Sequence, residues 1–306
     1  MIRRERGVAL VLVLWVITLL AVIAGNFAFS MRGEAQITRN LLGTAQAQAG
    51  ADAGVQLAWF ELLKPATEPQ RWQGNGVVHE FTLDGAAVRV SILDESGKID
   101  LNTASDALLQ GLFKSAGLSE EASGALLGAV LDWRDADNLK RLNGAEEEDY
   151  RAAGKNYVPS NAPFATVDEL QRVLGMNPAL YRKLAPALTV YSRQPGLNTA
   201  VAPRAALLAI PGVNPDLVEQ FLQQREQALA SGQAPPPFAG AGAFAASVGM
   251  QVYSVRSEAR LADGTVFVRQ AVARLTRVPN NPVAVLAWGE GDAEAPAPGN
   301  PIASNQ

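Results

Sequence analysis

The sequence has 306 residues, a formal net charge of −4, no cysteine and a single histidine, His79. The absence of cysteine excludes disulfides and thiolate metal sites, and a metal site built from imidazoles or a Ser-His-Asp relay would depend on His79 alone. The mild net charge is not that of an obvious polyanion binder, and the length allows two modest domains beyond an N-terminal segment.

The chain starts with a short basic leader, residues 1–7, followed by an apolar run from Val8 to Phe29. As a helix at ~1.5 Å per residue, this run would cover about 33 Å, which matches the hydrocarbon thickness of a bilayer. Three arginines precede the run against one glutamate, so the N-terminus is expected to stay in the cytoplasm while the rest crosses the membrane. Residues 8–29 therefore predict a single transmembrane helix.

Gly7 lies between the leader and the apolar run, whereas a small-residue site for signal peptidase after the run is poorly formed. This arrangement resembles the site where a prepilin peptidase cuts type IV pilins and type II secretion pseudopilins. The resemblance implies cleavage after Gly7, N-methylation of Val8 and a fifth mature position at Leu12. Most members of these families have a glutamate there, thought to neutralise the amino terminus of a neighbouring subunit, so a subunit with Leu12 suits a filament end. A membrane-anchored protein with a fortuitous Gly7 and no filament is the alternative.

Apolar residues continue at helical spacing to Leu62, and Pro65 ends the pattern. A continuous helix from Val8 to Lys64 would be about 85 Å long. Its five glycines weaken it but allow close approach of a neighbouring element: Gly25, Gly33, Gly43, Gly50 and Gly54. We expect this helix to pack against its own domain, against other helices in a filament, or both.

Two pairs of alternating segments predict β-hairpins. Residues 77–83 and 87–93 flank Asp84-Gly85, residues 251–261 and 265–275 flank Asp263-Gly264, and residues 283–288 suggest a last strand. His79 falls in the first run and is interpreted as an ordinary sheet residue. The pattern predicts an α+β fold in which the long helix (8–64) packs on an antiparallel sheet body (65–99 and 248–288), with an α-helical domain inserted at 100–247. The tail, residues 289–306, is rich in Pro, Gly and acids and is expected to be disordered.

The insert contains an internal repeat. Both copies begin with Leu-Asn-Thr-Ala, at residues 101–104 and 197–200, and continue as two helical segments around a glycine turn at Gly117 or Gly212. Thr103 or Ser105 in the first copy and Thr199 in the second are candidate helix N-caps, and Thr166 with Glu169 forms a capping-box pattern between the copies.

The repeat resembles the helix-hairpin-helix motif of DNA-binding proteins, which grips phosphates through backbone amides at the turn. A minor pilin or DNA-uptake component that binds DNA through these repeats is therefore an alternative function. Acidic residues occupy both turns, at Glu120, Glu121 and Asp216, and Pro215 removes an amide donor. Because a basic face is missing, nucleic acid is not expected to be a partner.

Several motifs in order resemble the minor pseudopilin family of the type II secretion system called GspK. The motifs are Asp100-Leu101-Asn102-Thr103-Ala104, Leu131-Asp132-Trp133-Arg134-Asp135, Gly144-Ala145-Glu146 with Tyr150, and Asp168-Glu169-Leu170. The resemblance runs from Arg3 to about Arg277. It implies a subunit of the bacterial inner membrane with its body in the periplasm, which forms the pseudopilus tip complex with I- and J-type minor pseudopilins and contacts the major pseudopilin and the prepilin peptidase. It also implies a role in the export of folded proteins across the outer membrane.

One loop concentrates oxygen ligands. The segment 132–149 contains six candidate calcium ligands: Asp132, Asp135, Asp137, Glu146, Glu147 and Asp149. Calcium prefers six to eight hard oxygen ligands on a flexible loop, although this spacing is not that of an EF-hand. Surface ion pairs with Arg134, Lys140 and Arg141 are the alternative, and the family resemblance implies calcium in this insert. A run of acids in one loop does not establish paired catalytic carboxylates, and no nucleotide-binding glycine loop is present, so no enzymatic activity is expected.

Overall fold

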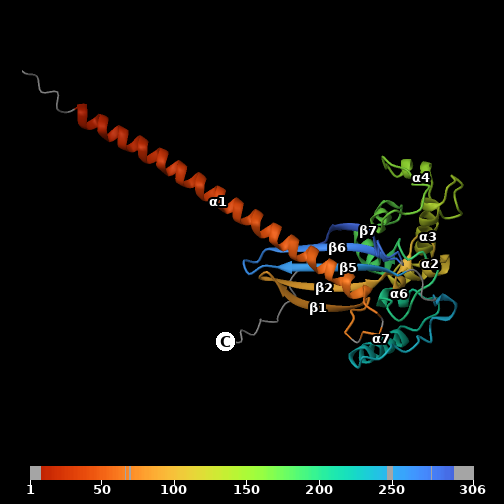
Figure 1. Cartoon of the computed structure of the whole chain (residues 1–306). Helices are drawn as coiled ribbons and strands as arrows, with labels where there is room; N and C mark the ends of the chain where they lie inside the picture. Colours follow the sequence, from red (N-terminus) through yellow and green to blue (C-terminus); the bar gives the residue numbers. More distant parts are fainter. Residues whose placement is uncertain (1–7, 66, 69, 247–250, 277, 293–306) are drawn as a thin grey trace, which may run out of the picture.

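A computed structural model describes the chain except for residues 1–7, 66, 69, 247–250, 277 and 293–306. The leader with Gly7 and most of the predicted tail therefore lie outside the described residues. Helix α1 (Val8–Leu63) is continuous over 56 residues, as the sequence predicted. Its N-terminal half extends away from the body, and its C-terminal half crosses one face of the sheet (Figure 1).

The body is a five-stranded antiparallel sheet in the order β1-β2-β5-β6-β7. Its strands are β1 (Asn75–Leu83), β2 (Ala86–Asp94), β5 (Val252–Arg260), β6 (Val266–Leu275) and β7 (Val283–Glu290). Strands β2 and β5 pair along their whole length, so the insert interrupts the sheet between two adjacent strands. Both predicted hairpins are confirmed, and His79 lies in β1 with its ring stacked on Trp72 at 4.0 Å between centroids. Strand β7 pairs with β6 as far as Glu290, so residues 289 and 290 belong to the sheet and not to the tail.

A layer of small residues lets α1 approach the sheet closely. The helix contributes Ala47, Ala51, Val55 and Ala58 to a core shared with the inner faces of β2, β5 and β6. A Cβ atom added to Gly54 would lie 2.2 Å from Ser257 Oγ, and one added to Gly50 would lie 3.2 Å from the Cβ of Ala259. Gly50 and Gly54, which weaken the helix in isolation, are thus required by its packing on the sheet.

An ion pair fixes the rotation of α1 on the sheet. Arg269 of β6 is almost fully buried, and its Nε donates to Asp52 Oδ1 of α1 at 2.5 Å. The same guanidinium lies over the rings of Phe267 and Trp288, 4.9 and 5.0 Å from their centroids. Burial of this arginine is tolerable because the Asp52 carboxylate neutralises its charge and aromatic rings pack on the flat faces of the guanidinium.

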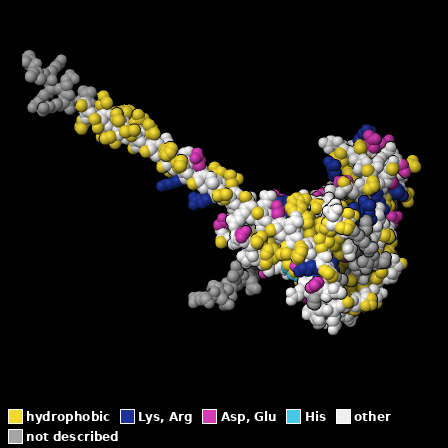
Figure 2. Space-filling model, in the orientation of Figure 1, with side chains coloured by type: hydrophobic (Ala, Val, Ile, Leu, Met, Phe, Trp, Pro, Cys, Tyr) yellow, Lys and Arg dark blue, Asp and Glu magenta, His cyan; other side chains and the backbone are white. Residues whose placement is uncertain are grey.

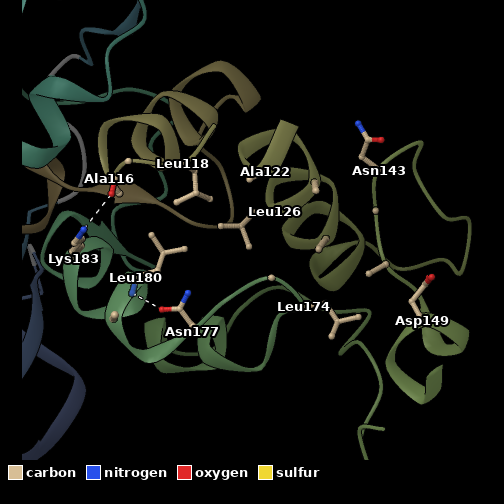
Figure 3. A pocket seen from close by; sticks show the side chains of 17 residues that line it. Ala116, Leu118, Ala122, Leu126, Asn143, Asp149, Leu174, Asn177, Leu180 and Lys183 are labelled. Carbon is tan, nitrogen blue, oxygen red and sulfur yellow. Dashed lines mark hydrogen bonds between the residues drawn. The ribbon is translucent and has the colours of Figure 1, made fainter. Parts of the chain in front are cut away.

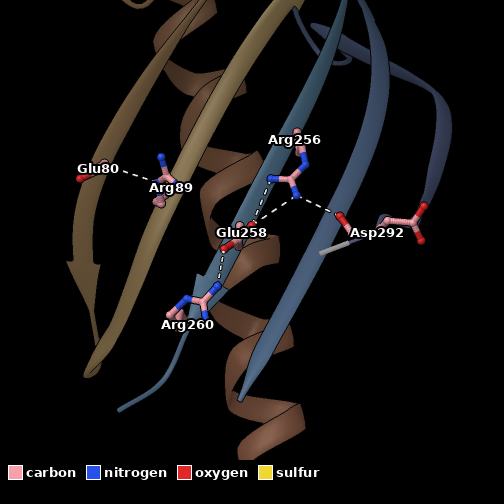
Figure 4. Close-up of polar contacts among 6 residues, drawn as sticks. All are labelled: Glu80, Arg89, Arg256, Glu258, Arg260 and Asp292. Carbon is pink, nitrogen blue, oxygen red and sulfur yellow. Dashed lines mark hydrogen bonds and ion pairs between the residues drawn. The ribbon is translucent and has the colours of Figure 1, made fainter. Parts of the chain in front are cut away.

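The sheet face opposite α1 carries charged side chains (Figure 4). Arg89 Nε donates to Glu80 at 2.8 Å, while Glu258 accepts from Arg256 at 3.3 Å and from Arg260 at 3.1 Å. With acids and arginines alternating across the strands, this face needs no second apolar layer. Among the described residues, the hydrophobic cluster of the body lies between α1 and the sheet.

The insert has a separate hydrophobic core and consists of short helices joined by loops. Its helices are α2 (Asp106–Ser115), α3 (Glu120–Arg134), α4 (Glu147–Ala152), α5 (Pro178–Leu184), α6 (Arg204–Leu208) and α7 (Pro215–Ala230). Strands β3 (Ile99–Asp100) and β4 (Leu188–Thr189) form a two-residue parallel pair, and 3-10 turns η1 (Glu95–Gly97), η2 (Val167–Arg172), η3 (Ala185–Ala187) and η4 (Gly242–Phe244) complete the elements. The insert lies at the end of the sheet farthest from the apolar half of α1 (Figure 1).

The predicted caps are only partly confirmed. Ser105 caps α2, and Gly117 and Gly212 have the positive φ expected of turn glycines. Thr199 caps no helix: α6 starts at Arg204, because Pro203 disfavours helical geometry in the residue before it. Thr166 makes no side-chain cap either, since the segment that follows it is the 3-10 turn η2, and Glu169 accepts from the backbone of Ala165.

Substitution of Gly54 tests the close approach of α1 to the sheet. We expect Gly54→Ala to destabilise the protein by about 1–3 kcal/mol through overpacking against Ser257, despite a gain in helix propensity of about 1 kcal/mol. Gly33→Ala is the matched control, since no atom lies within 4 Å of the added Cβ, and it should be neutral or slightly stabilising. Thermal unfolding of the full chain in detergent micelles measures both. Equal melting temperatures for the two variants would show that the approach is not tight.

Candidate functional site

The acidic loop runs between the end of α3 and the start of α4. Asp132, in the last turn of α3, is fully buried, and a Cβ added to Gly144 would lie 1.8 Å from its Oδ2. A Cβ on Gly128, one turn earlier, would lie 2.8 Å from the Asn143 carbonyl. The end of the loop therefore packs closely against α3 at Gly128 and Gly144. This close packing covers the Asp132 side chain.

Arg141 holds the middle of the loop. Its backbone N–H donates to Asp132 Oδ2 at 3.3 Å, its Nε lies 3.2 Å from Asp132 Oδ1, and its Nη2 donates to Asp135 Oδ2 at 2.9 Å. The arginine side chain itself is about half exposed. One guanidinium thus faces two carboxylates, one of which is completely removed from water.

Glu146 is the third acid of this cluster. It is the N-cap residue of α4 and is 6% exposed; its side chain faces the Asp149 N–H in a capping-box arrangement, but neither carboxylate oxygen forms a hydrogen bond. Burial raises the pKa of Glu146, and repulsion from Asp132 and Asp135 raises it further. Burial also raises the pKa of Asp132, against the opposing effects of the Arg141 backbone and side chain. The two buried acids are therefore incompletely stabilised by the protein itself.

The remaining predicted ligands have other partners. Asp137 accepts from the backbone of Leu139, and Asp149 accepts from Lys140 at 2.6 Å and from the backbone of Glu146 at 2.9 Å. The hydrogen bond from Lys140 lowers the pKa of Asp149. Glu147 pairs with Arg151 one turn later on α4. The structure thus separates the six acids into one group, made of the buried Asp132 and Glu146 with the partly exposed Asp135, and three acids with other partners.

The first group, which we call the acid cluster, has the chemistry of a hard-cation site. Asp135 Oδ1 and both oxygens of Glu146 are buried without hydrogen-bond partners, and Asp132 Oδ1 has only its ion pair with Arg141. Buried carboxylate oxygens with so few partners are costly, and such oxygens are the ligands that calcium prefers. Within the part of the chain that the structure describes, no three such side chains already stand in a metal-holding arrangement. The oxygens fit a calcium ion in kind, and ligation would require the side chains to turn toward a common point.

A cavity of about 730 Å³ borders the acidic loop (Figure 3). Its floor is the alanine-rich side of α3 with Leu126, and Leu118 and Leu180 line it from the neighbouring elements. Asn143, Gly144 and Asp149 form the wall on the loop side. The cavity therefore meets the loop at Asn143 and Gly144, where the loop contacts α3.

The two hairpin turns lack free basic groups. Lys114 pairs with Glu120 at 2.5 Å beside the first turn, and Arg204 pairs with Glu219 at 2.5 Å beside the second. Phosphate binding would have to displace these acids. The structure therefore gives no observation that favours the DNA-binding alternative.

The second feature with functional geometry is the outward side of α1. Seven positions spaced three or four residues apart carry no charge: Leu42, Ala45, Ala49, Ala53, Gln56, Phe60 and Leu63. Leu42, Phe60 and Leu63 are exposed, as are Ala45 and Ala49. We call these positions the outer strip. It faces solvent beside the body and follows the apolar N-terminal half, visible as the continuous hydrophobic surface in Figure 2. Helix α1 is long and apolar enough to cross a membrane.

Comparisons with known proteins decide the family. The family model described as "Type II secretion system (T2SS), protein K" matches residues 90–195. Type II secretion system protein K of Klebsiella pneumoniae is 30% identical over 229 residues, covering 67% of this chain and 70% of the relative. The chain belongs to the type II secretion system protein K family. It is a minor pseudopilin, a structural component of the secretion system, and the apolar half of α1 makes it membrane-anchored with a periplasmic body.

Two further matches cover most of the chain. Type II secretion system protein K of Pseudomonas aeruginosa is 27% identical over 325 aligned positions, covering 97% of this chain and 96% of the relative. Among solved structures, the GspK-GspI-GspJ complex of the enterotoxigenic Escherichia coli type 2 secretion system matches with a TM-score of 0.59 at 17% identity, covering 86% of this chain and 99% of that one. This confirms the α+β protein K fold, in which a helical insert interrupts the sheet.

Sequence reasoning missed several residues that the structure brings together. The Asn102 side chain donates to the Phe164 carbonyl and accepts from its N–H, while Asn198 donates through its backbone and side chain to Ser96 in η1. Each Leu-Asn-Thr-Ala segment thus ties the insert to a distant segment, a role that no local pattern reveals. The predicted ion pairing of Arg141 with acids of this loop is confirmed, but one of its partners, Asp132, is fully buried and not on the surface.

Proposed function

We propose that this minor pseudopilin forms the tip complex of the periplasmic pseudopilus with I- and J-type minor pseudopilins, above the major pseudopilin, and so assists export of folded proteins across the outer membrane. The observation that carries the proposal is the outer strip of α1. The fold match to a chain of the GspK-GspI-GspJ complex supports it. The role is structural and not enzymatic, and the anchor is placed in the bacterial inner membrane.

The outer strip has the properties of a helix-packing surface. Its small residues Ala45, Ala49 and Ala53 allow a second backbone to approach closely, and Leu42, Phe60 and Leu63 supply apolar area at either end. The opposite side of α1 is already buried on the sheet, so the strip remains for a partner. Because α1 rises directly from the membrane segment, a partner helix anchored in the same membrane can lie along it.

Two features favour the end position in a filament. Leu12 is 62% exposed on the membrane half of α1 and supplies no carboxylate for the amino terminus of a further subunit. The insert lies at the far end of the body, where it widens the molecule beyond the sheet (Figure 1). A subunit above this one would lack a charge partner and would meet the insert.

A charge on the outer strip tests the partner surface. We expect Ala49→Glu to reduce co-purification of the full chain with I- and J-type pseudopilins by about tenfold or more, because the carboxylate would be buried between helices. Gln48→Glu is the matched control, since it adds the same charge at an exposed position beside the strip and should leave the complex intact. Cells that carry Ala49→Glu should likewise secrete less protein than cells that carry Gln48→Glu. Equal recovery of partners with both variants would contradict the strip as the contact surface.

We also propose that a prepilin peptidase cleaves after Gly7 and that Val8 is then methylated. Mass spectrometry of the protein from cells should find a mature N-terminal N-methylvaline at position 8. Gly7→Leu should retain the leader, because the peptidase accepts a small residue at the cleavage point. An intact Met1, or a terminus near residue 25, would contradict this processing and leave a plain anchored protein.

We further propose that the acid cluster binds calcium, with Asp132, Asp135 and Glu146 as protein ligands. The other three acids, Asp137, Glu147 and Asp149, could add oxygen ligands only by leaving their present partners. The bound ion would supply positive charge to carboxylates that the fold leaves without enough hydrogen bonds. Isothermal titration of the full chain in detergent should show calcium binding. Glu146→Gln should weaken it by about tenfold or more, while Glu148→Gln, at an exposed neighbour on α4, should not change it. The absence of heat in the wild-type protein would reject the site.

A further inference from the structure

We propose that Arg141 is a tethered counterion that occupies the acid cluster and leaves it when a divalent cation binds, so that the loop carrying Leu139 and Leu142 takes two positions. The inference rests on the calcium site proposed above, and it concerns which group of the protein competes with the ion. Its basis is the contacts of Arg141, the unpaired oxygens around it and the packing of the loop.

Arg141 is placed as a bound cation would be. Its Nε and Nη2 lie 3.2 Å from Asp132 Oδ1 and 2.9 Å from Asp135 Oδ2, so the guanidinium bridges two acids of the cluster. The Arg141 side chain is about half exposed to solvent, whereas the Asp132 side chain is fully buried. A group in this position can withdraw without disturbing the hydrophobic core.

The charges do not balance while Arg141 is the counterion. Three carboxylates carry −3 and one guanidinium +1, which leaves −2 in a largely buried region, and both oxygens of Glu146 remain unpaired. The neighbouring cations are engaged: Lys140 pairs with Asp149, and Arg134 donates to the Leu101 carbonyl. Asp137 adds repulsion. A divalent cation would supply the two missing positive charges. The Arg141 guanidinium, in contact with the same oxygens, would repel that cation.

The packing of the loop defines which part can move. Asn143 and Gly144 are fixed by close contact with Gly128 and Asp132, and Asp135 is the C-cap of α3. Between these points, three side chains hold the loop: Arg141 contacts Asp132 and Asp135, Lys140 pairs with Asp149, and Asn138 accepts from Asn161 Nδ2 at 2.6 Å. Leu139 and Leu142, which flank Lys140 and Arg141, are 77% and 97% exposed. Withdrawal of Arg141 would therefore shift the two leucines while the anchored residues stay.

The test compares two basic side chains in the full chain in detergent micelles. Arg141→Gln removes the competing charge, and Lys155→Gln, at an exposed position just after α4, is the matched control. We expect Arg141→Gln to bind calcium roughly tenfold more tightly than wild type by titration calorimetry, and Lys155→Gln to bind as wild type does. In chelator, Arg141→Gln should melt at a lower temperature than wild type, and saturating calcium should abolish most of that difference.

Equal or weaker calcium binding by Arg141→Gln would overturn the exchange, because Arg141 would then support the site instead of competing for it. Unchanged binding by both Glu146→Gln and Asp132→Asn would instead reject the acid cluster as the site, a failure of the earlier proposal. If Arg141→Gln does not fold in chelator, Leu142→Trp in the otherwise wild-type chain supplies a second readout. Its fluorescence should shift on calcium addition, and no shift relative to the unsubstituted protein would contradict movement of the loop.

Discussion

The close contact between α1 and the sheet is the constraint on which the rest of the molecule depends. Gly50 and Gly54 bring the helix backbone onto β2 and β5, and the Asp52–Arg269 pair fixes the rotation of the helix about its axis. The rotation of α1 determines which of its residues point toward solvent, because one side of the helix is buried against the sheet. The contact between α1 and the sheet therefore determines which residues form the outer strip. A partner helix would pack against a surface whose orientation is set by the sheet.

Two buried acidic sites in the insert show the difference between a structural and a functional carboxylate. Asp100 is fully buried, and it accepts from the backbones of Asn102, Thr103 and Arg193 and from the Ser192 hydroxyl. Asp132 and Glu146 are as deeply buried, yet oxygens of both lack hydrogen-bond partners. Because desolvation is costly for a charged group, the first site is complete as it stands and the second invites an external cation.

The same reasoning relates the parts to a minor pseudopilin. The membrane half of α1 anchors the chain, the outer strip offers a surface to neighbouring helices, and the insert is tied to the body through Ser96, Asn198 and the buried Glu95–Lys98 and Glu95–Thr189 contacts. These ties make the insert a fixed extension of the sheet. The acidic loop with Leu139 and Leu142 is the part of this extension that has few contacts of its own.

By itself, the sequence determined the long helix, both hairpins, the interrupted sheet and the concentration of acids between Asp132 and Asp149, because helical periodicity, strand alternation and Asp-Gly turns are local signals. It misplaced the second N-cap at Thr199, where Pro203 overrides the local preference. Only the tertiary structure separated the buried acids Asp132 and Glu146 from the paired Glu147 and Asp149, and only it showed that Arg141 contacts both Asp132 and Asp135. Burial and charge pairing depend on residues far apart in the chain, so no local pattern contains them.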